Sequence, residues 1–268
     1  MKFQDKVVVV TGGGNGLGRQ LVLELLRRKA RVAAVDINEP ALNETRVLAA
    51  QLSQNLTTHI LNITDSAAVS AFPQQIIDQH GQVDGLINNA GIIQPFVRLA
   101  ELEDAAIERV MQINFFGLLH MTRAFLPSLK NRPSAHITNI SSMGGFLPVP
   151  GQTIYGASKA AVKLLTEGLH SELRTTAVRV TLALPGAMQT NIAENSGIRI
   201  DPEMASRQKD YQALPADQAA HIILDAMEKD QYRVLVGKDA RFMDLIYRLS
   251  PERAAGYIFK KMRALLPD

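Results

Sequence analysis

Short apolar runs alternate with longer amphipathic stretches along the first two hundred residues, and this alternation limits the possible folds more than any other feature of the chain. The apolar runs are rich in Val, Ile and Leu and are flanked by turn residues, which is typical of buried strands. They lie at residues 6–12, 30–36, 58–63, 83–91, 136–142 and 178–186. Helical patterns lie between them, for example at 17–29 and 68–80. Apolar strands that alternate with helices are characteristic of a parallel sheet covered on both faces. We therefore predict a doubly wound, Rossmann-type α/β fold in a single domain.

The composition excludes several kinds of site. The chain has no Cys, which rules out disulfides, thiolate metal ligands and a cysteine nucleophile. Its six His residues are scattered, without the short spacing of a zinc-binding helix, so we expect no metal. The net charge is +3, and the segment 238–268 alone holds seven basic and four acidic residues, so the rest of the chain is balanced. Without a basic face there, we expect no nucleic-acid partner.

Targeting signals are not evident either. The N-terminal apolar run is too short for a signal peptide and follows charged residues. The longest uncharged stretch, 133–158, is broken by Pro, Gly, Ser and Asn, whereas a membrane-spanning helix needs about 20 mostly apolar residues. We therefore expect a soluble, cytoplasmic protein.

Polar residues follow directly on most of the apolar runs. They are Thr11-Gly12, Asp36, Asn88-Asn89, Ser141-Ser142 and Pro185-Gly186. In doubly wound sheets the ligand binds outside the carboxyl ends of the strands. The sequence therefore predicts that these residues meet at one binding site.

The first of these positions opens a glycine-rich loop with the sequence TGGGNGLGRQ. Glycines let a phosphate approach the main chain and the N-terminus of the following helix. The loop lacks the Lys and the Ser or Thr of a P-loop, because Arg19-Gln20 stand in their place. The spacing Gly12-x-x-x-Gly16-x-Gly18 also differs from G-x-G-x-x-G. A purely structural turn is the alternative interpretation of the loop.

Asp36 ends the second apolar run, 20 residues after Gly16. A carboxylate at this distance can accept hydrogen bonds from an adenosine ribose, and it repels a 2′-phosphate. No Arg or Lys stands at position 37 or 38. We therefore predict NAD rather than NADP as the cofactor; the alternative is that Asp36 caps a helix or is simply solvated.

The motifs taken together resemble those of the short-chain dehydrogenase/reductase family, in its compact single-domain branch, over residues 6–190. They are, in order, TGGGNGLG, NNAG at 88–91, QINFFG with Asn114, NISS with Ser142, YGASK with Tyr155 and Lys159, and PGAMQT. The resemblance implies the catalytic residues Asn114, Ser142, Tyr155 and Lys159, and implies that Ser141 is structural. It also implies, with the glycine loop and Asp36, a set of cofactor-binding residues: Gly12, Asn15, Gly16, Leu17, Gly18, Asp36, Asn62, Ile63, Asn89, Ala90, Gly91, Tyr155, Lys159, Pro185, Gly186, Met188 and Thr190. Many relatives have Asp at the position of Asn62, and the NNAG stretch could instead brace neighbouring strands.

Tyr155 and Lys159 are four residues apart, so both can face one cleft if the segment is helical. Bringing a phenol from its usual pKa near 10 to about 7 needs roughly 4 kcal/mol. A single exposed lysine supplies much less, but the positive nicotinamide ring of bound NAD⁺ adds to its effect. We therefore expect Lys159 to activate Tyr155 only when the cofactor is bound. In this hypothesis Ser142 and Tyr155 hydrogen-bond the substrate oxygen, Lys159 bonds the nicotinamide ribose, and Asn114 holds a water.

The domain organisation follows from the same resemblance. We expect a dinucleotide-binding and catalytic domain over 1–237, with a mobile substrate loop at about 186–216. The substrate pocket would draw on Ile92, Ile93, Phe96 and residues 144–153. These are mostly apolar, which predicts a small lipophilic alcohol or ketone as substrate.

The remaining residues, 238–268, predict two amphipathic helices that meet at Ser250-Pro251, a favourable N-cap and first-turn pair. Two apolar faces are expected: Phe242, Leu245, Ile246 and Leu249 on the first helix, and Ala255, Ile258, Phe259 and Met262 on the second. We expect this basic tail to pack on the domain or across a subunit interface; contact with an anionic membrane surface is the alternative.

The predicted function is thus hydride transfer between NAD and a lipophilic secondary alcohol or ketone, with Tyr155 as the acid/base. Two alternatives stay open: an NADP-dependent 3-oxoacyl reductase-like enzyme, and a non-catalytic regulator that senses the dinucleotide. Asp36 disfavours the first, and the complete set of proton-transfer residues disfavours the second. The resemblance implies a homo-oligomer, since relatives commonly form tetramers or dimers through the helices around 104–130 and 155–175, and we expect the same here.

Overall fold

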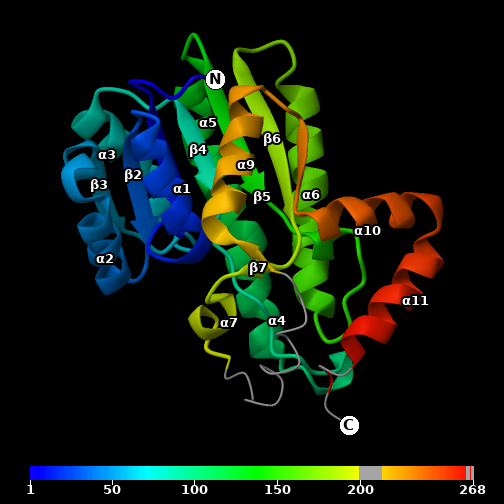
Figure 1. The fold of residues 1–268 in the computed structure, drawn as a ribbon. Coiled ribbons are helices and arrows are strands. Elements are labelled where there is room, and N and C mark those ends of the chain that lie inside the picture. Colours follow the sequence, from blue (N-terminus) through cyan, green and yellow to red (C-terminus); the bar gives the residue numbers. More distant parts are fainter. Residues whose placement is uncertain (199–212, 264–265, 267–268) are drawn as a thin grey trace.

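The computed structural model describes residues 1–198, 213–263 and 266. Within these residues a seven-stranded parallel sheet forms the centre of the molecule (Figure 1). Its strands stand in the order β3 (Leu56–Ile60), β2 (Arg31–Asp36), β1 (Val7–Thr11), β4 (Gly85–Asn88), β5 (Ala135–Ile140), β6 (Val178–Pro185) and β9 (Arg233–Val236). The order reverses between β1 and β4, and the predicted doubly wound, Rossmann-type fold is confirmed.

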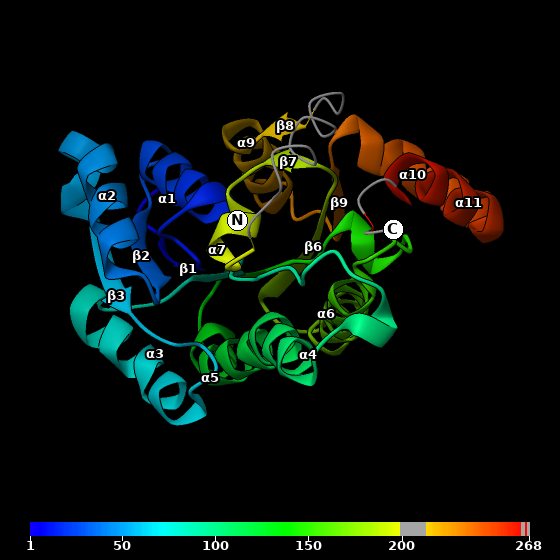
Figure 2. The ribbon, with the colours of Figure 1, turned by 90° about the horizontal axis from the view of Figure 1, so that it is seen from below.

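Helices cover both faces of the sheet (Figure 2). One face carries α1 (Gly16–Arg27), α2 (Glu39–Ala49) and α9 (Ala216–Glu228). The other carries α3 (Ser66–His80), α4 (Asp104–Met111), α5 (Leu118–Lys130) and α6 (Thr153–Glu172). Alternate residues of β1 belong to different cores: Val8 and Val10 pack on the side of α1 and α9, and Val7 and Val9 on the side of α3 and α5. Both faces of the strands are therefore buried, which is why these runs are apolar without alternation.

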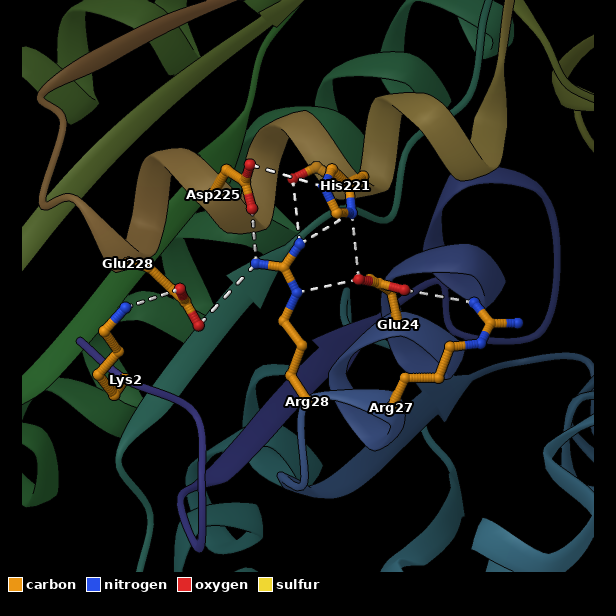
Figure 3. Close-up of polar contacts among 7 residues, drawn as sticks. All are labelled: Lys2, Glu24, Arg27, Arg28, His221, Asp225 and Glu228. Atoms are coloured by element: carbon orange, nitrogen blue, oxygen red, sulfur yellow. Dashed lines mark hydrogen bonds and ion pairs between the residues drawn. The ribbon is translucent and has the colours of Figure 1, made fainter.

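Helices α1 and α9 are far apart in the sequence but lie side by side, and an ionic cluster joins them (Figure 3). Arg28 lies at its centre, and its guanidinium contacts Glu24 at 3.0 Å, Asp225 at 2.8 Å and Glu228 at 3.9 Å. His221 also contacts Glu24, at 3.2 Å. The cluster helps to fix how α9 docks against the first helix of the domain.

Strand β9 was not among the strands expected from the sequence. It is a run of only four residues, RVLV, and it pairs in parallel with the end of β6. So short a run carries too little periodicity to be recognised, and its pairing partner lies about fifty residues earlier in the chain. Strand β3 also differs slightly from the expected run, because it begins at Leu56 and ends at Ile60.

The tail forms two helices, α10 (Lys238–Leu249) and α11 (Pro251–Met262), which meet at Ser250. They form a hairpin at the β9 edge of the molecule (Figure 1). Ser250 is the N-cap residue of α11, as expected, although its side chain makes no capping hydrogen bond. Part of the tail packs on the domain, because Met243 and Ile258 join a core cluster with Leu147.

The apolar faces expected for the tail are only partly the buried ones. Three of the expected residues pack inward: Ile246, Ile258 and Met262. Four others are exposed: Phe242, Leu245, Leu249 and Phe259. The apolar periodicity therefore located the helices but did not give their orientation.

A charged residue sets the orientation of α10. Its buried residues are Ala240, Met243 and Asp244. The Asp244 carboxylate accepts two hydrogen bonds from Arg233 of β9, at 2.6 and 3.1 Å, and this ion pair ties the helix to the edge of the sheet. Hydrophobic periodicity could not reveal the contact, since the anchoring residue is charged.

Within the described ranges, the helices are all too short or too polar to cross a membrane. Over the same ranges, no three His, Asp or Glu side chains gather closely enough to hold a metal ion.

Candidate active site

A cleft of about 610 Å³ lies at the carboxyl ends of the strands, where the sheet order reverses. The described residues that line it include every position predicted to bind the cofactor, from Gly12 in the glycine loop to Thr190 after β6. Ser142 lines it as well, whereas Asn114 is fully buried and is not among the lining residues. The parallel strands bring these residues together, because each strand delivers its following residue to the same edge of the sheet.

The glycine loop between β1 and α1 is tightly packed. Gly12 and Gly16 have φ angles of +68° and +52°, which favour glycine over other residues. A Cβ atom on Gly18 would overlap the main-chain oxygen of Gly12, so no side chain fits there. The loop leads into the N-terminus of α1, whose N–H groups and dipole favour an anion.

Two side chains outside the predicted site hold this loop in place. The Thr45 hydroxyl is fully buried and donates to the main-chain oxygen of Gly13 at 3.1 Å. Arg19 donates from Nε to the main-chain oxygen of Gly14 at 2.9 Å. The residue that replaces the P-loop lysine therefore supports the loop.

Asp36, at the end of β2, reaches the same loop. Its Oδ2 atom accepts a hydrogen bond from the N–H of Gly14 at 2.9 Å, and its Oδ1 atom accepts one from the N–H of Asn38 at 3.0 Å. Asp36 also lines the cleft. The carboxylate thus has a structural role in the loop and a position from which it can contact a bound ligand.

Asn88, the first residue of the NNAG stretch, braces the centre of the sheet. Its side chain is buried and donates to Asn139 at 2.8 Å and to Thr122 at 3.0 Å. Asn88 is not among the described residues that line the cleft. The Asn88 side chain therefore braces neighbouring segments, as the alternative interpretation of the NNAG stretch predicts.

The rest of the NNAG stretch borders the cleft. Thr11 Oγ1 accepts hydrogen bonds from the N–H groups of Asn89 and Ala90, at 3.0 and 3.1 Å. Asn89, Ala90 and Gly91 all line the cleft. The stretch thus combines bracing with a position beside the ligand site.

Tyr155 and Lys159 lie one turn apart on α6, and both line the cleft. Lys159 Nζ lies 6.0 Å from the centroid of the Tyr155 ring and donates to the main-chain oxygen of Ile140 at 3.0 Å. Ser142, after β5, makes a side-chain hydrogen bond with Tyr155. The neighbouring Ser141 hydroxyl instead donates to the main-chain oxygen of Lys159 at 2.7 Å.

Burial dominates the titration of Tyr155 and Lys159. It raises the pKa of the Tyr155 phenol above the ordinary value, and the hydrogen bond with Ser142 offsets only part of this effect. Burial also lowers the pKa of Lys159 to about 8. In the protein alone, Lys159 therefore does not bring the pKa of Tyr155 below its usual range.

Asn114 lies in an irregular helical turn, the π-helical segment Gln112–Gly117 between α4 and α5. Its side chain is fully buried, and its amide donates to the main-chain oxygen of Ile92 at 2.9 Å and to Ser158 at 3.0 Å. Its Oδ1 atom accepts from the N–H of Ile92 at 2.8 Å. Both ends of the amide are thus engaged by protein groups, and Asn114 ties the loop after β4 to α6.

The substrate side of the cleft differs from the expected pocket. Ile92 and Ile93 line the cleft, but Phe96 and residues 144–153 are not among its described lining residues. Several apolar side chains of this stretch instead pack with the tail helices: Phe146, Leu147 and Val149. The sequence could not show this, because their partners come from a much later segment of the chain.

The substrate loop expected at about 186–216 is described only in part, since residues 199–212 lie outside the described residues. Its beginning contains the short helix α7 (Ile192–Asn195). Strand β7 (Met188–Gln189) pairs with β8 (Leu214–Pro215), which brings the two described ends of the loop together.

The residue after α7 connects this loop to the cleft. Ser196 accepts a hydrogen bond from the N–H of Ile93 at 3.0 Å. Its main-chain oxygen accepts one from Arg109 of α4 at 3.3 Å. Arg109 also lines the cleft and was not foreseen, because nothing in its sequence neighbourhood marks it.

Known proteins share both the sequence and the fold. The family model of short chain dehydrogenases matches residues 6–200. SadH, a putative oxidoreductase of Mycobacterium tuberculosis, is 34% identical over 254 residues, which cover 92% of this chain and 91% of that protein.

Two solved structures have a similar fold. A short-chain dehydrogenase/reductase from Burkholderia phymatum in complex with NAD has a TM-score of 0.83 at 25% identity, over 93% of this chain and 96% of that one. A short chain dehydrogenase from Burkholderia cenocepacia J2315 in complex with NADP has a TM-score of 0.80 at 28% identity, over 96% and 99% of the two chains.

Proposed function

The chain belongs to the short-chain dehydrogenase/reductase family of oxidoreductases, and from this premise we propose that it transfers a hydride between NAD and a lipophilic secondary alcohol or ketone, with Tyr155 as the acid/base. The observation that carries the proposal is the convergence of Ser142, Tyr155 and Lys159 in one cleft with a glycine loop.

The described residues fit a nicotinamide dinucleotide. The loop of Gly12, Gly16 and Gly18 is closely packed and leads into a helix N-terminus, which suits a pyrophosphate. Asp36 lies beside that loop, at a position that suits a ribose. When bound, the cofactor supplies a nicotinamide carbon that accepts or gives the hydride.

The protein's own residues would handle the proton. In the oxidative direction the Tyr155 phenolate would take the proton of the substrate hydroxyl, and the hydride of the substrate carbon would pass to the nicotinamide that the bound cofactor supplies, so that the alcohol would become a ketone. Ser142 would orient the substrate oxygen and stabilise the phenolate through its hydrogen bond. Lys159 would bond the nicotinamide ribose and add positive charge beside Tyr155. Asn114 would act indirectly. Its side-chain amide donates to Ser158 of α6 and so helps to hold the first turns of that helix.

NAD is favoured over NADP by the charge at the end of β2. Asp36 would repel a 2′-phosphate, and Ile37 and Asn38 after it offer no positive charge. The Arg19 side chain is engaged by the main-chain oxygen of Gly14 and by Glu44. Relatives with NAD and with NADP both share the fold, so the proposed preference rests on Asp36.

The substrate is proposed to be lipophilic because Ile92, Ile93 and Ile192 line the same cleft as Tyr155. A homo-oligomer is proposed through α4, α5 and α6. On these helices and the segment between them, Phe116 is 38% exposed and Leu164 is 69% exposed, which leaves apolar surface for a second copy to cover.

The experiment is a measurement of NAD⁺ and NADP⁺ reduction against a panel of lipophilic secondary alcohols, with Tyr155→Phe beside the unaltered protein. We expect turnover with NAD⁺, its loss in Tyr155→Phe, and NAD⁺ binding by calorimetry that is nearly the same in both. Tyr257→Phe is the matched control, because this tyrosine of α11 is 43% exposed and is not among the lining residues of the cleft. Full activity in Tyr155→Phe would exclude the proposed role of the phenol.

Two other results would favour the alternatives. A clear preference for NADP⁺ would point to a 3-oxoacyl reductase-like enzyme and against the role given to Asp36. Tight NAD⁺ binding without turnover on any substrate would favour a dinucleotide-sensing regulator.

A further inference from the structure

Gln94 is a polar residue in the loop after β4, and its side chain is fully buried. Its Oε1 atom accepts hydrogen bonds from the N–H groups of Ile154 at 2.8 Å and Tyr155 at 3.0 Å. Its Nε2 group donates to the main-chain oxygen of Gly151 at 3.0 Å. Each polar atom of this buried amide therefore has a partner in the segment that begins α6.

Helix α6 has no side-chain cap of its own. Its N-cap residue is Gln152, which makes no capping hydrogen bond and instead donates to the main-chain oxygen of Gln94 at 2.7 Å. The first N–H groups of a helix have no partner within the helix, and burying them without one is costly. Gln94 supplies that partner from a loop about sixty residues earlier in the chain.

The first turn of α6 is the turn that carries Tyr155. Ser142, the hydrogen-bond partner of Tyr155, belongs to a different segment, the one after β5. Lys159 lies one turn further on and has an anchor of its own at the main-chain oxygen of Ile140. The distance between the Tyr155 phenol and Ser142 therefore depends on how firmly the first turn is held, whereas the position of Lys159 depends on it less.

We propose that Gln94 is a positioning residue for Tyr155, which caps the first turn of α6 from outside the helix and so holds the phenol in register with Ser142. The inference rests on the proposed function of Tyr155 as the acid/base. Gln94 is not among the described residues that line the cleft, and it acts on the reaction only through α6.

The charged residues that line the cleft with Tyr155, among those described, are Lys159, Arg109 and Asp36. The hydrogen bonds of the Gln94 side chain go to main-chain groups. A neutral substitution at position 94 therefore leaves this charge set intact. Any change in the titration of Tyr155 then reports the position of the phenol relative to Ser142 and Lys159.

The test compares two substitutions of Gln94. Gln94→Met keeps the length of the side chain without an acceptor for the two N–H groups. Gln94→Glu keeps an acceptor for both N–H groups in either protonation state, and in its protonated form it can also donate to the main-chain oxygen of Gly151. Gln152→Met is the matched control, since it removes a neighbouring buried amide that does not bond the N–H of Tyr155. Its Oε1 atom has no hydrogen-bond partner among the described residues, so Gln152→Met removes a single hydrogen bond of the side chain, the one from Nε2 to the main-chain oxygen of Gln94.

For Gln94→Met we expect kcat to fall by about 10- to 100-fold, because small misplacements of a reacting group are costly. The KM for NAD⁺ should stay within about twofold, because the glycine loop and Asp36 are untouched. Gln94→Glu should recover most of the loss, and Gln152→Met should keep its kcat.

A second readout does not depend on turnover. The protein has five Tyr residues, so ¹³Cζ-tyrosine labelling with Tyr155→Phe for assignment resolves the Tyr155 phenol by NMR. In the NAD⁺-loaded protein we expect the pKa of Tyr155 to rise in Gln94→Met and not in Gln152→Met, because the hydrogen bond from Ser142 is weakened. Exchange of the Tyr155 amide hydrogen should be faster in Gln94→Met as well.

The outcomes separate the two proposals. If the unaltered protein turns over substrate, two results overturn the positioning role. The first is an unchanged kcat in Gln94→Met. The second is a lowered kcat in Gln94→Met with an unchanged pKa of Tyr155 and no recovery in Gln94→Glu. Absence of wild-type turnover instead overturns the proposed function, and the NMR titration and amide exchange still decide whether Gln94 positions the phenol. If Gln94→Met does not fold, Gln94→Asn, which withdraws the acceptor by one methylene group, is judged by the same criteria.

Discussion

The Oδ2 atom of Asp36 accepts a hydrogen bond from the main-chain N–H of Gly14 at 2.9 Å, so the carboxylate at the end of β2 is tied to the glycine loop that follows β1. A Cβ atom on Gly14 would also lie 2.9 Å from the same carboxylate oxygen. The residue proposed to choose between NAD and NADP therefore also shapes the loop that would hold the pyrophosphate. Its two roles can be separated, because one depends on charge and the other on a hydrogen-bond acceptor.

Asp36→Asn should shift cofactor preference without loosening the loop. The amide oxygen can still accept from the N–H of Gly14, whereas the N–H of Asn38 loses its acceptor and the charge that repels a 2′-phosphate is gone. We expect the ratio of kcat/KM for NAD⁺ to that for NADP⁺ to fall by about tenfold or more. Asp36→Ala should weaken binding of both cofactors, because it removes the acceptor too. Equal ratios in Asp36→Asn and the unaltered protein would remove the charge argument.

Lys159 should make stability depend on pH in the absence of cofactor. Its pKa is lowered from 10.5 to about 8 by burial, so above pH 8 the unfolded chain holds a proton that the folded protein has released. The free energy of unfolding should therefore rise between about pH 8 and pH 10 relative to that of Lys159→Met, which lacks the group. Urea unfolding of both proteins below and above the lowered pKa measures the difference. If the difference in the free energy of unfolding between the two proteins does not change with pH, Lys159 titrates at its ordinary value in the folded state.

Gly186 and Asp239 should behave as a coupled pair. The Asp239 carboxylate accepts a hydrogen bond from the N–H of Ala187 at 2.7 Å, and a Cβ atom on Gly186 would overlap that carboxylate. Gly186→Ala should therefore disturb the loop after β6 and raise the KM for NAD⁺. The double variant Gly186→Ala with Asp239→Ala should bind NAD⁺ better than Gly186→Ala alone, because the clash is gone. Calorimetric Kd values for NAD⁺ in the unaltered protein, the two single variants and the double variant form a double-mutant cycle. Additive effects of the two substitutions on the free energy of binding would mean that the two sites are not coupled.

Arg28 should stabilise the junction of α1 and α9 shown in Figure 3. The Arg28 side chain is 14% exposed and contacts three carboxylates, so Arg28→Met leaves Glu24 partly buried with fewer partners. We expect it to lower the free energy of unfolding by about 1–2 kcal/mol at low salt and by less at high salt. Arg27→Met is the control, because Arg27 is 57% exposed and should cost less than about 0.5 kcal/mol. Equal losses in the two variants would mean that the cluster contributes nothing beyond a surface ion pair.

The same cluster predicts how the contribution of Arg28 to the free energy of unfolding changes with pH. Burial alone would raise the pKa of Glu24, but the hydrogen bonds from Arg28 and His221 outweigh it and lower the pKa below the ordinary value of 4.5. The stabilisation is therefore present above that value and is lost as the pH falls through the folded-state pKa. The difference in stability between the unaltered protein and Arg28→Met should narrow at acid pH. A difference that stays constant down to about pH 3 would assign the effect of Arg28 to packing of its aliphatic stem.

Much of the cleft could be predicted from the sequence because its residues stand next to strands. Each buried parallel strand is a local apolar run, and the residue that follows it must lie at one edge of the sheet. This rule places Asp36, Asn89 and the pair Ser141-Ser142, and the family resemblance then selects Ser142 from that pair. The spacing of Tyr155 and Lys159 is equally local, since four residues make about one helical turn.

Only the tertiary structure decided how those residues are held. Gln94 caps a helix about sixty residues away, Asp239 reaches the loop after β6, and Asp244 turns α10 so that part of its apolar face is exposed. Each of these is a single polar side chain whose partner is distant in the chain. Periodicity and spacing are patterns among residues that are close together in the sequence. They therefore predict the layers of the fold and the residues at the carboxyl edge of the sheet. A lone contact between distant segments leaves no repeating pattern, and it emerges only when packing has brought the two segments together.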